Sequence, residues 1–91
     1  MTIFKITLNV VEQQYVMLPN VYKILCTQMQ HDNICMWIQV DPSAVEQAYD
    51  IRIFGTGQPG ITDNMQYIDT VQKFNGDLVL HVYVVREQHV L

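Results

Sequence analysis

The sequence predicts an all-β domain, an antiparallel sandwich or small barrel of about seven short strands. Two observations support this prediction. Apolar and polar residues alternate with period two almost from end to end. Turn-forming residues interrupt that alternation about every 8 to 12 residues, which is typical of sandwiches and barrels. The chain of 91 residues is long enough for a modest core, so we expect a single β domain over residues 1–91.

Four strands are expected in the first half of the chain, at residues 4–10, 14–17, 23–30 and 34–40. A turn at residues 31–33 joins the third strand to the fourth. The two cysteines, Cys26 and Cys35, lie on either side of this turn. In a chain without an export signal, two cysteines are more often buried thiols than a disulfide, so we expect both to be reduced and unreactive.

Three further strands are expected at residues 48–54, 66–74 and 77–86. Before them, Ser43 and Glu46 resemble a capping box, which predicts one helical turn at residues 43–47. Asn75-Gly76 predicts a type I′ hairpin, because both central positions need positive φ. The last strand is apolar on both faces, which indicates a central strand or one covered by another subunit. Residues 87–91 show no clear period and could form a loose tail or an arm on a neighbour.

Composition restricts the possible partners. Five Lys and Arg against nine Asp and Glu give a net charge of −4, whereas nucleic-acid binding needs a basic stripe, so we expect no nucleic acid partner. No apolar run approaches the roughly 18 residues of a membrane span, and no signal peptide pattern is present, so we expect a cytoplasmic protein without a membrane partner. Charged residues make up 15% of the chain, below the roughly 25% typical of soluble domains. Either neutral polar residues such as glutamine cover the surface, or part of it is buried against another subunit, and we expect a homo-oligomer.

The residue types that carry enzyme chemistry are sparse and scattered. Ser43 is the only serine and stands in a turn, where a cap is the ordinary explanation. The histidines His31, His81 and His89 have no metal-ligand spacing between them and no adjoining cysteine. We therefore expect no catalytic residues, no metal and no cofactor, and a protein that is not an enzyme.

Residues 55–60, Gly-Thr-Gly-Gln-Pro-Gly, spell the dinucleotide-binding pattern G-x-G-x-x-G. That pattern works where a strand leads through a glycine turn into a helix. Here β-branched residues and turn formers follow, without helical periodicity, so we do not predict a dinucleotide-binding fold. The loop is still the place where backbone freedom is concentrated.

Arg52, two residues before the loop, shares a strand face with Asp50 and Phe54 by parity. An arginine beside exposed glycine amides can hold a phosphate or carboxylate, while Phe54 or Trp37 offers a ring for a base to stack on. The alternative is structural: Arg52 pairs with Asp50 or a cross-strand acid, Phe54 packs, and the loop only turns a corner. The predicted ligand-binding residues are Trp37, Arg52, Phe54, Gly55, Thr56, Gly57, Gln58 and Pro59.

Several segments together resemble a family of small proteins found in bacteriophage and prophage genomes. They are Leu18-Pro19, Lys23-Ile24-Leu25, Met36-Trp37, Val40-Asp41-Pro42, residues 52–59 (Arg-Ile-Phe-Gly-Thr-Gly-Gln-Pro) and residues 67–72 (Tyr-Ile-Asp-Thr-Val-Gln). The resemblance covers most of the chain, and its most specific piece is residues 52–59. Family members are expected to carry His at the position of Gln58, and this departure weakens any catalytic role for the loop. The resemblance implies a phage accessory or counter-defence protein.

Two functions follow as expectations. The first is a protein that binds and sequesters a nucleotide-derived signal without catalysis, in a pocket of a homo-oligomer. The alternative is an interaction module that inhibits a host protein through an edge strand or an exposed aromatic and methionine patch.

Overall fold

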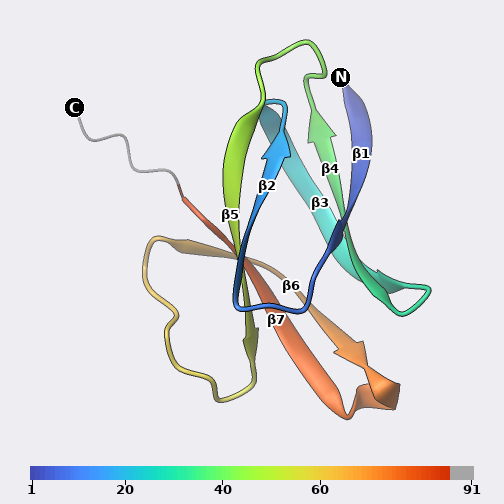
Figure 1. Ribbon diagram of the computed structural model, residues 1–91, viewed down its shortest axis with the longest axis vertical. Coiled ribbons are helices and arrows are strands. Elements are labelled where there is room, and N and C mark those ends of the chain that lie inside the picture. The colour runs from blue at the N-terminus through green and yellow to red at the C-terminus, as the bar shows by residue number, and fades with distance from the viewer. Residues whose placement is uncertain (87–91) are drawn as a thin grey trace.

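The computed structural model describes residues 1–86, and the expected tail at residues 87–91 lies outside them. Seven strands form two antiparallel sheets in a sandwich-like fold (Figure 1), which confirms the predicted fold class. The strands are β1 (Thr2–Leu8), β2 (Gln13–Leu18), β3 (Val21–Gln30), β4 (Asn33–Val40), β5 (Gln47–Gly55), β6 (Met65–Lys73) and β7 (Leu78–Val85). Residues 1–86 contain no helix with the length and hydropathy that crossing a bilayer requires.

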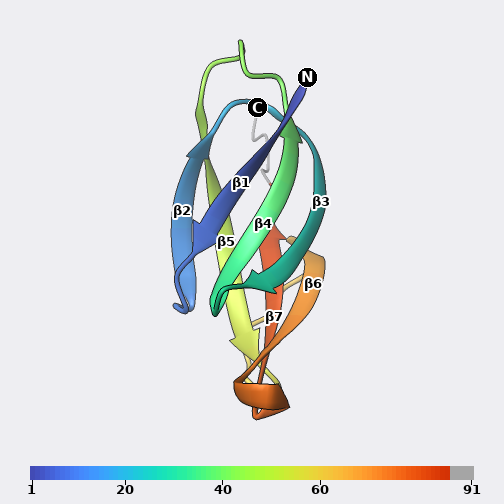
Figure 2. The ribbon, with the colours of Figure 1, turned by 90° about the vertical axis from the view of Figure 1, so that its right-hand side faces the viewer.

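The first sheet has the strand order β1-β4-β3 and the second has the order β2-β5-β7-β6. Figure 2 shows the three-stranded sheet facing the viewer, with β2 and β5 behind it. Strand β7 lies between β5 and β6, which confirms one of the two explanations offered for its apolar faces. A central strand needs no second subunit to account for its composition.

The core lies between the sheets and is built from the inward positions of the period-two pattern. In β5, Ile51 and Ile53 are buried in the core, whereas Asp50 and Arg52 point outward, as strand parity predicts. The remaining core residues follow the same rule and are Leu8, Leu18, Ile34, Met36, Ile38, Val40, Val71, Leu80, Val82 and Val84.

The predicted helical turn at residues 43–47 is wrong. Asp41 organises this segment instead, because its carboxylate accepts hydrogen bonds from the Ser43 amide at 3.1 Å and the Ser43 hydroxyl at 2.7 Å. These bonds lower the pKa of Asp41. The Ala44 amide donates to the Asp41 carbonyl at 3.1 Å, which closes a turn. The acceptor for Ser43 is thus an aspartate two positions earlier, in an Asx-type turn, instead of a helix cap.

The hairpin turn at Asn75-Gly76 is confirmed. Asn75 has φ 54 and ψ 33, close to the first central residue of a type I′ turn, and Gly76 has φ 92. Phe74 also has a positive φ of 53, so a one-turn segment, η1 (Phe74–Gly76), lies between β6 and β7. The connection is therefore longer than the two residues of the simplest hairpin.

A hydrogen bond joins the edges of the two sheets, β3 and β6. The Thr27 amide on β3 donates to Asp69 Oδ2 on β6 at 3.1 Å, and Asp69 Oδ1 accepts from the Thr70 amide at 3.0 Å. Both strands have a register shift just before this contact, between Ile24 and Cys26 and between Tyr67 and Asp69. Figure 1 shows β3 and β6 converging towards their C-terminal ends and diverging towards their starts. The sandwich is therefore open on one side.

Candidate functional site

The glycine loop, residues 55–60, begins with a turn that two hydrogen bonds close. The Gln58 amide donates to the Gly55 carbonyl at 3.0 Å, and the Gly55 amide donates back to Gln58 Oε1 at 3.0 Å. Gly57 has φ 87, the conformation that a type II turn requires at its third residue. The Gly55 and Gln58 amides are thus engaged within the turn, while the Gly57 amide makes no turn or loop hydrogen bond among residues 1–86.

Arg52 forms an ion pair with Asp50, as the structural explanation of this residue predicts. Its Nε lies 2.8 Å from Asp50 Oδ1 and its Nη2 lies 3.1 Å from Asp50 Oδ2, a two-pronged ion pair that raises the pKa of Arg52. Gln13 Nε2 also donates to Asp50 Oδ2, at 3.2 Å. Two of the five N–H groups of the guanidinium group are used on Asp50, so Arg52 acts first on Asp50.

Neither of the two rings predicted to stack on a ligand, Phe54 and Trp37, is available beside the glycine loop. Phe54 is 1% exposed. It packs against the edge of Tyr83, with ring centroids 5.7 Å apart. Gly60 lies so close that a Cβ there would come 3.3 Å from the Phe54 ring. Trp37 belongs to β4 of the other sheet, where it pairs with Lys5 and Cys26. The structure therefore brings seven predicted residues together, residues 52 and 54–59, and separates Trp37 from them.

A polar network that the sequence analysis missed ties the glycine loop to the sheet. Thr56 Oγ1 lies 2.8 Å from His81 Nε2, and His81 Nδ1 lies 3.0 Å from Thr70 Oγ1. Thr70 Oγ1 is in turn 2.6 Å from the Tyr67 hydroxyl. Strand parity places His81 with Tyr83 on the outer face, but the network depends on β7 pairing with both β5 and β6. Local sequence does not reveal that pairing.

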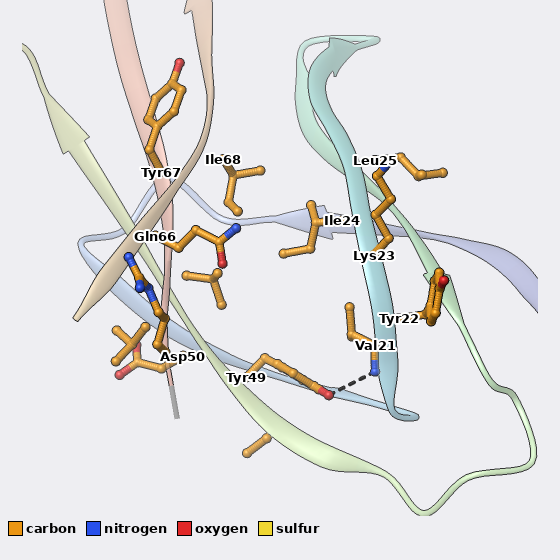
Figure 3. Close-up of a pocket in the computed structure, with 14 residues that line it drawn as sticks. Val21, Tyr22, Lys23, Ile24, Leu25, Tyr49, Asp50, Gln66, Tyr67 and Ile68 are labelled. Carbon is orange, nitrogen blue, oxygen red and sulfur yellow. Dashed lines mark hydrogen bonds between the residues drawn. The ribbon is translucent and has the colours of Figure 1, made fainter. Parts of the chain in front are cut away.

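A groove of about 580 Å³ lies away from the glycine loop, where β3 diverges from β6. Its two walls come from opposite sheets, and Figure 3 shows Ile24 of β3 and Ile68 of β6 facing each other across it. At one end the Tyr49 hydroxyl accepts a hydrogen bond from the Val21 amide at 3.0 Å. The other lining residues are Tyr22, Lys23, Leu25, Ala48, Asp50, Gln66, Tyr67, Val84, Val85 and Arg86.

The polar groups of the groove lie mainly on the side of β5, β6 and β7. Gln66 extends from β6 towards Ile24 (Figure 3), and the exposed Arg86 follows the end of β7. Lys23 runs along β3 on the side away from Ile68 in this view. The groove thus combines apolar walls with the Gln66 amide and the Arg86 guanidinium group, which has no ion-pair partner among residues 1–86. This combination suits a ligand with an apolar ring and an anionic group.

The hollow beside the glycine loop is much smaller. Gly55 and Gln58 line a space of about 140 Å³ together with Val10, Val11, Glu12, Ile53 and Leu80. Small-molecule sites commonly occupy about 300 to 1,000 Å³, so this hollow could hold only a fragment of a nucleotide. Within residues 1–86, no three His, Cys, Asp or Glu side chains are placed to hold a metal ion.

Comparison with known proteins places the chain in a family but not in a functional class. A family model described as "Domain of unknown function (DUF7352)" matches residues 1–91. Neither the curated proteins nor the solved structures gave a match. The chemistry must therefore be argued from the groove and the loop themselves.

Proposed function

We infer that this chain, which belongs to the DUF7352 family, is a binding protein that sequesters a small nucleotide-like molecule without chemically changing it. The observation that carries the proposal is the groove of about 580 Å³ between the two sheets, apolar on both walls and bearing Gln66 and Arg86. The proposed ligand site is therefore the opening between β3 and β6, in place of the predicted glycine loop.

The chemistry of the groove fits a planar base with an attached anionic group. Ile24 and Ile68 face each other from the two walls, a spacing of apolar surfaces into which an aromatic ring can slide. The Gln66 amide offers both a donor and an acceptor to the edge of a base. Arg86 offers a guanidinium group to a phosphate or carboxylate.

Arg52 supports this site indirectly. Asp50 also lines the groove, and a free carboxylate there would repel an anionic ligand. Because Arg52 binds both carboxylate oxygens, the charge of Asp50 is largely compensated. The charges left over at the groove are then those of Lys23 and Arg86, which favour an anion.

The biological role that we propose is removal of a nucleotide-derived signal during phage infection. Support for it comes from the resemblance of residues 52–59 to small phage proteins. A sequestering protein needs only affinity, and a small β domain with one open groove can supply it.

A binding screen tests the proposal. Thermal shift followed by calorimetry against cyclic dinucleotides, ADP-ribose variants and common nucleotides should identify at least one stabilising ligand. Arg86→Ala should weaken its affinity at least tenfold, and Ile68→Trp, which fills the groove, should abolish binding. Lys73→Ala is the matched control, because Lys73 lies over Phe74 at the β6–β7 turn. The ligand should be recovered intact after heat denaturation, and a chemically altered ligand would contradict sequestration.

A second candidate function is inhibition of a host protein through the outer face of the four-stranded sheet. The edge strand β2 exposes Tyr15 by 65% and Met17 by 57%, and Tyr67 is 52% exposed on the same face. Exposed aromatic and methionine side chains are common at interaction surfaces. Met17→Lys should abolish partner binding and leave binding of a small molecule in the groove unchanged. The opposite pattern would favour the groove alone.

A further inference from the structure

The Thr56, His81, Thr70 and Tyr67 side chains form a continuous hydrogen-bonded chain on the outer face of the four-stranded sheet. Its distances are 2.8, 3.0 and 2.6 Å in that order. Thr56 is exposed at its end, whereas His81 and Thr70 are half-buried. A hydroxyl within hydrogen-bond reach of an imidazole, whose other nitrogen is held by a third group, is the geometric pattern of an activated nucleophile.

The direction of the hydrogen bonds decides what the chain can do. If the Thr56 hydroxyl donates to Nε2, then Nδ1–H donates to Thr70, and the Thr70 hydroxyl donates to Tyr67. Every donor then has an acceptor, and the exposed Tyr67 hydroxyl can donate to water. In this orientation Nε2 carries the lone pair that a base requires. Thr70 holds the ring in that tautomer, so it acts as a positioning residue.

A backbone donor lies on the same turn. The Gly57 amide makes no turn or loop hydrogen bond among the described residues, and Gly57 has no side chain to shield it. A developing oxyanion beside a nucleophile is commonly stabilised by a neighbouring backbone amide. The rings of Tyr83 and Tyr67, with centroids 5.6 Å apart, form an aromatic surface in the adjacent cross-strand row.

We propose that Thr56 and His81 form an acyl-transfer centre for carboxylic esters with an aromatic leaving group, separate from the groove. The Thr56 oxygen attacks the ester carbonyl carbon while its proton passes to His81 Nε2. The tetrahedral intermediate then expels the aryloxide, which takes the proton from Nε2 and leaves as a phenol, so that an acyl ester remains on Thr56. Water attacks this ester with His81 again accepting the proton, which releases a carboxylic acid and restores the threonine.

The probe that tests the proposal is para-nitrophenyl acetate. The protein should release para-nitrophenolate in a burst of about one equivalent, and digestion with mass spectrometry should find one acetyl group on Thr56. Thr56→Ala should remove the burst, while Thr56→Ser, which keeps the hydroxyl, should retain it. His81→Gln should slow acylation of Thr56 by about a hundredfold or more, the usual scale for loss of a general base.

Controls separate this centre from ordinary surface acylation. Thr62→Ala removes a hydroxyl group from the β5–β6 connection, and this hydroxyl bonds Asn64 instead of an imidazole. His31→Asn removes an exposed histidine in a turn. Both variants should react at the wild-type rate, and all variants should keep the circular dichroism spectrum of the parent. The proposal is overturned if Thr56→Ala reacts as fast as wild type, or if the acetyl group is found on histidine or lysine alone. Groove binding is unaffected by either result, so the two proposals stand or fall separately.

Discussion

At the scale of single residues, one buried hydroxyl group should lower the stability of the protein. Thr27 is 1% exposed, and its Oγ1 has no hydrogen-bond partner among the described residues. An unsatisfied buried polar group costs about 1 to 3 kcal/mol. Thr27→Val replaces that hydroxyl by a methyl group and keeps the branched shape that suits a strand. We expect it to raise the free energy of unfolding by about 1 kcal/mol in urea titrations.

The control for this change is Thr7→Val, because Thr7 is exposed and has only a distant contact, 3.9 Å, with the Cys35 sulfur. It should alter stability by less than about 0.5 kcal/mol. A Thr27→Val protein that is less stable than wild type would show that the hydroxyl has a partner, such as a buried water molecule.

The two residues of the Arg52–Asp50 ion pair should affect the affinity for an anionic ligand in opposite directions. Arg52→Ala leaves the Asp50 carboxylate at the groove without its cation, so affinity for an anionic ligand should fall about tenfold. Asp50→Asn removes the negative charge, so affinity should rise or stay level. Since the pair is partly exposed, with 26% and 18% of the side chains accessible, neither change should lower stability by more than about 1 kcal/mol. Calorimetry on both variants checks the signs, and an equal effect of the two changes would contradict this role.

At the scale of elements, one carboxylate links β3 to β6 by a hydrogen bond. Asp69 accepts from the Thr27 amide on β3 and from the Thr70 amide on its own strand. Asp69→Ala leaves the nearly buried Thr27 amide without its acceptor. Loss of a hydrogen bond to a charged group typically costs about 1.5 to 3 kcal/mol, so we expect a loss of about 2 kcal/mol. Thermal and urea unfolding measure it.

Asp69→Asn is the intermediate variant, since its one remaining carbonyl oxygen can serve only one of the two amides. It should lose less stability than Asp69→Ala. Asp63→Ala, a change of the same kind in an exposed loop, is the control and should be close to neutral. An Asp69→Ala protein as stable as this control would mean that the two sheet edges are held together by packing alone.

The β3–β4 turn gives a second prediction at this scale. His31 and Asp32 have φ values of 49 and 65, a left-handed conformation that side chains disfavour. Glycine adopts it without this cost, as in the common Asn-Gly and Asp-Gly hairpins. Asp32→Gly should therefore stabilise the protein by about 0.5 kcal/mol, and Asp32→Ala should destabilise it. If both changes act in the same direction in urea titrations, backbone strain does not limit stability here.

The positions of the strands, and the sheet face to which their side chains point, were predictable from the sequence because they depend on local alternation. All seven strands occur within about two residues of their expected positions, and Arg52 lies outside the core as its parity predicts, although Phe54 is buried. The extra residues of the irregularities in β3 and β6 were not predictable, since a bulge leaves the flanking pattern nearly intact. The helical turn at residues 43–47 failed because Asp41 competes for the Ser43 amide.

At the scale of the whole molecule, the groove could not be predicted because it depends on how two sheets diverge. Val21 and Gln66 are far apart in sequence, and nothing local shows that they lie across an opening. The same holds for Trp37, which an argument from residue type placed near Arg52 but which strand pairing assigns to the other sheet. The loop was found because glycine and proline reveal turns directly. Its link to His81 required the strand order.

Self-association is the last prediction and concerns the whole surface. β7 no longer argues for it, since a central strand accounts for that apolar pattern, but the charged fraction remains 15%. Tyr15 and Met17 expose apolar surface on the same face of the edge strand β2, a position at which a second copy can cover them. Light scattering at micromolar concentration should therefore give a mass of at least twice 10.6 kDa. Met17→Lys should shift it towards the monomer, because an ammonium group at the centre of a contact resists desolvation. Phe74→Lys removes an equally exposed ring at the β6–β7 turn and should leave the mass unchanged. A wild-type protein that is monomeric at every concentration would mean that neutral polar side chains alone make up for the missing charges.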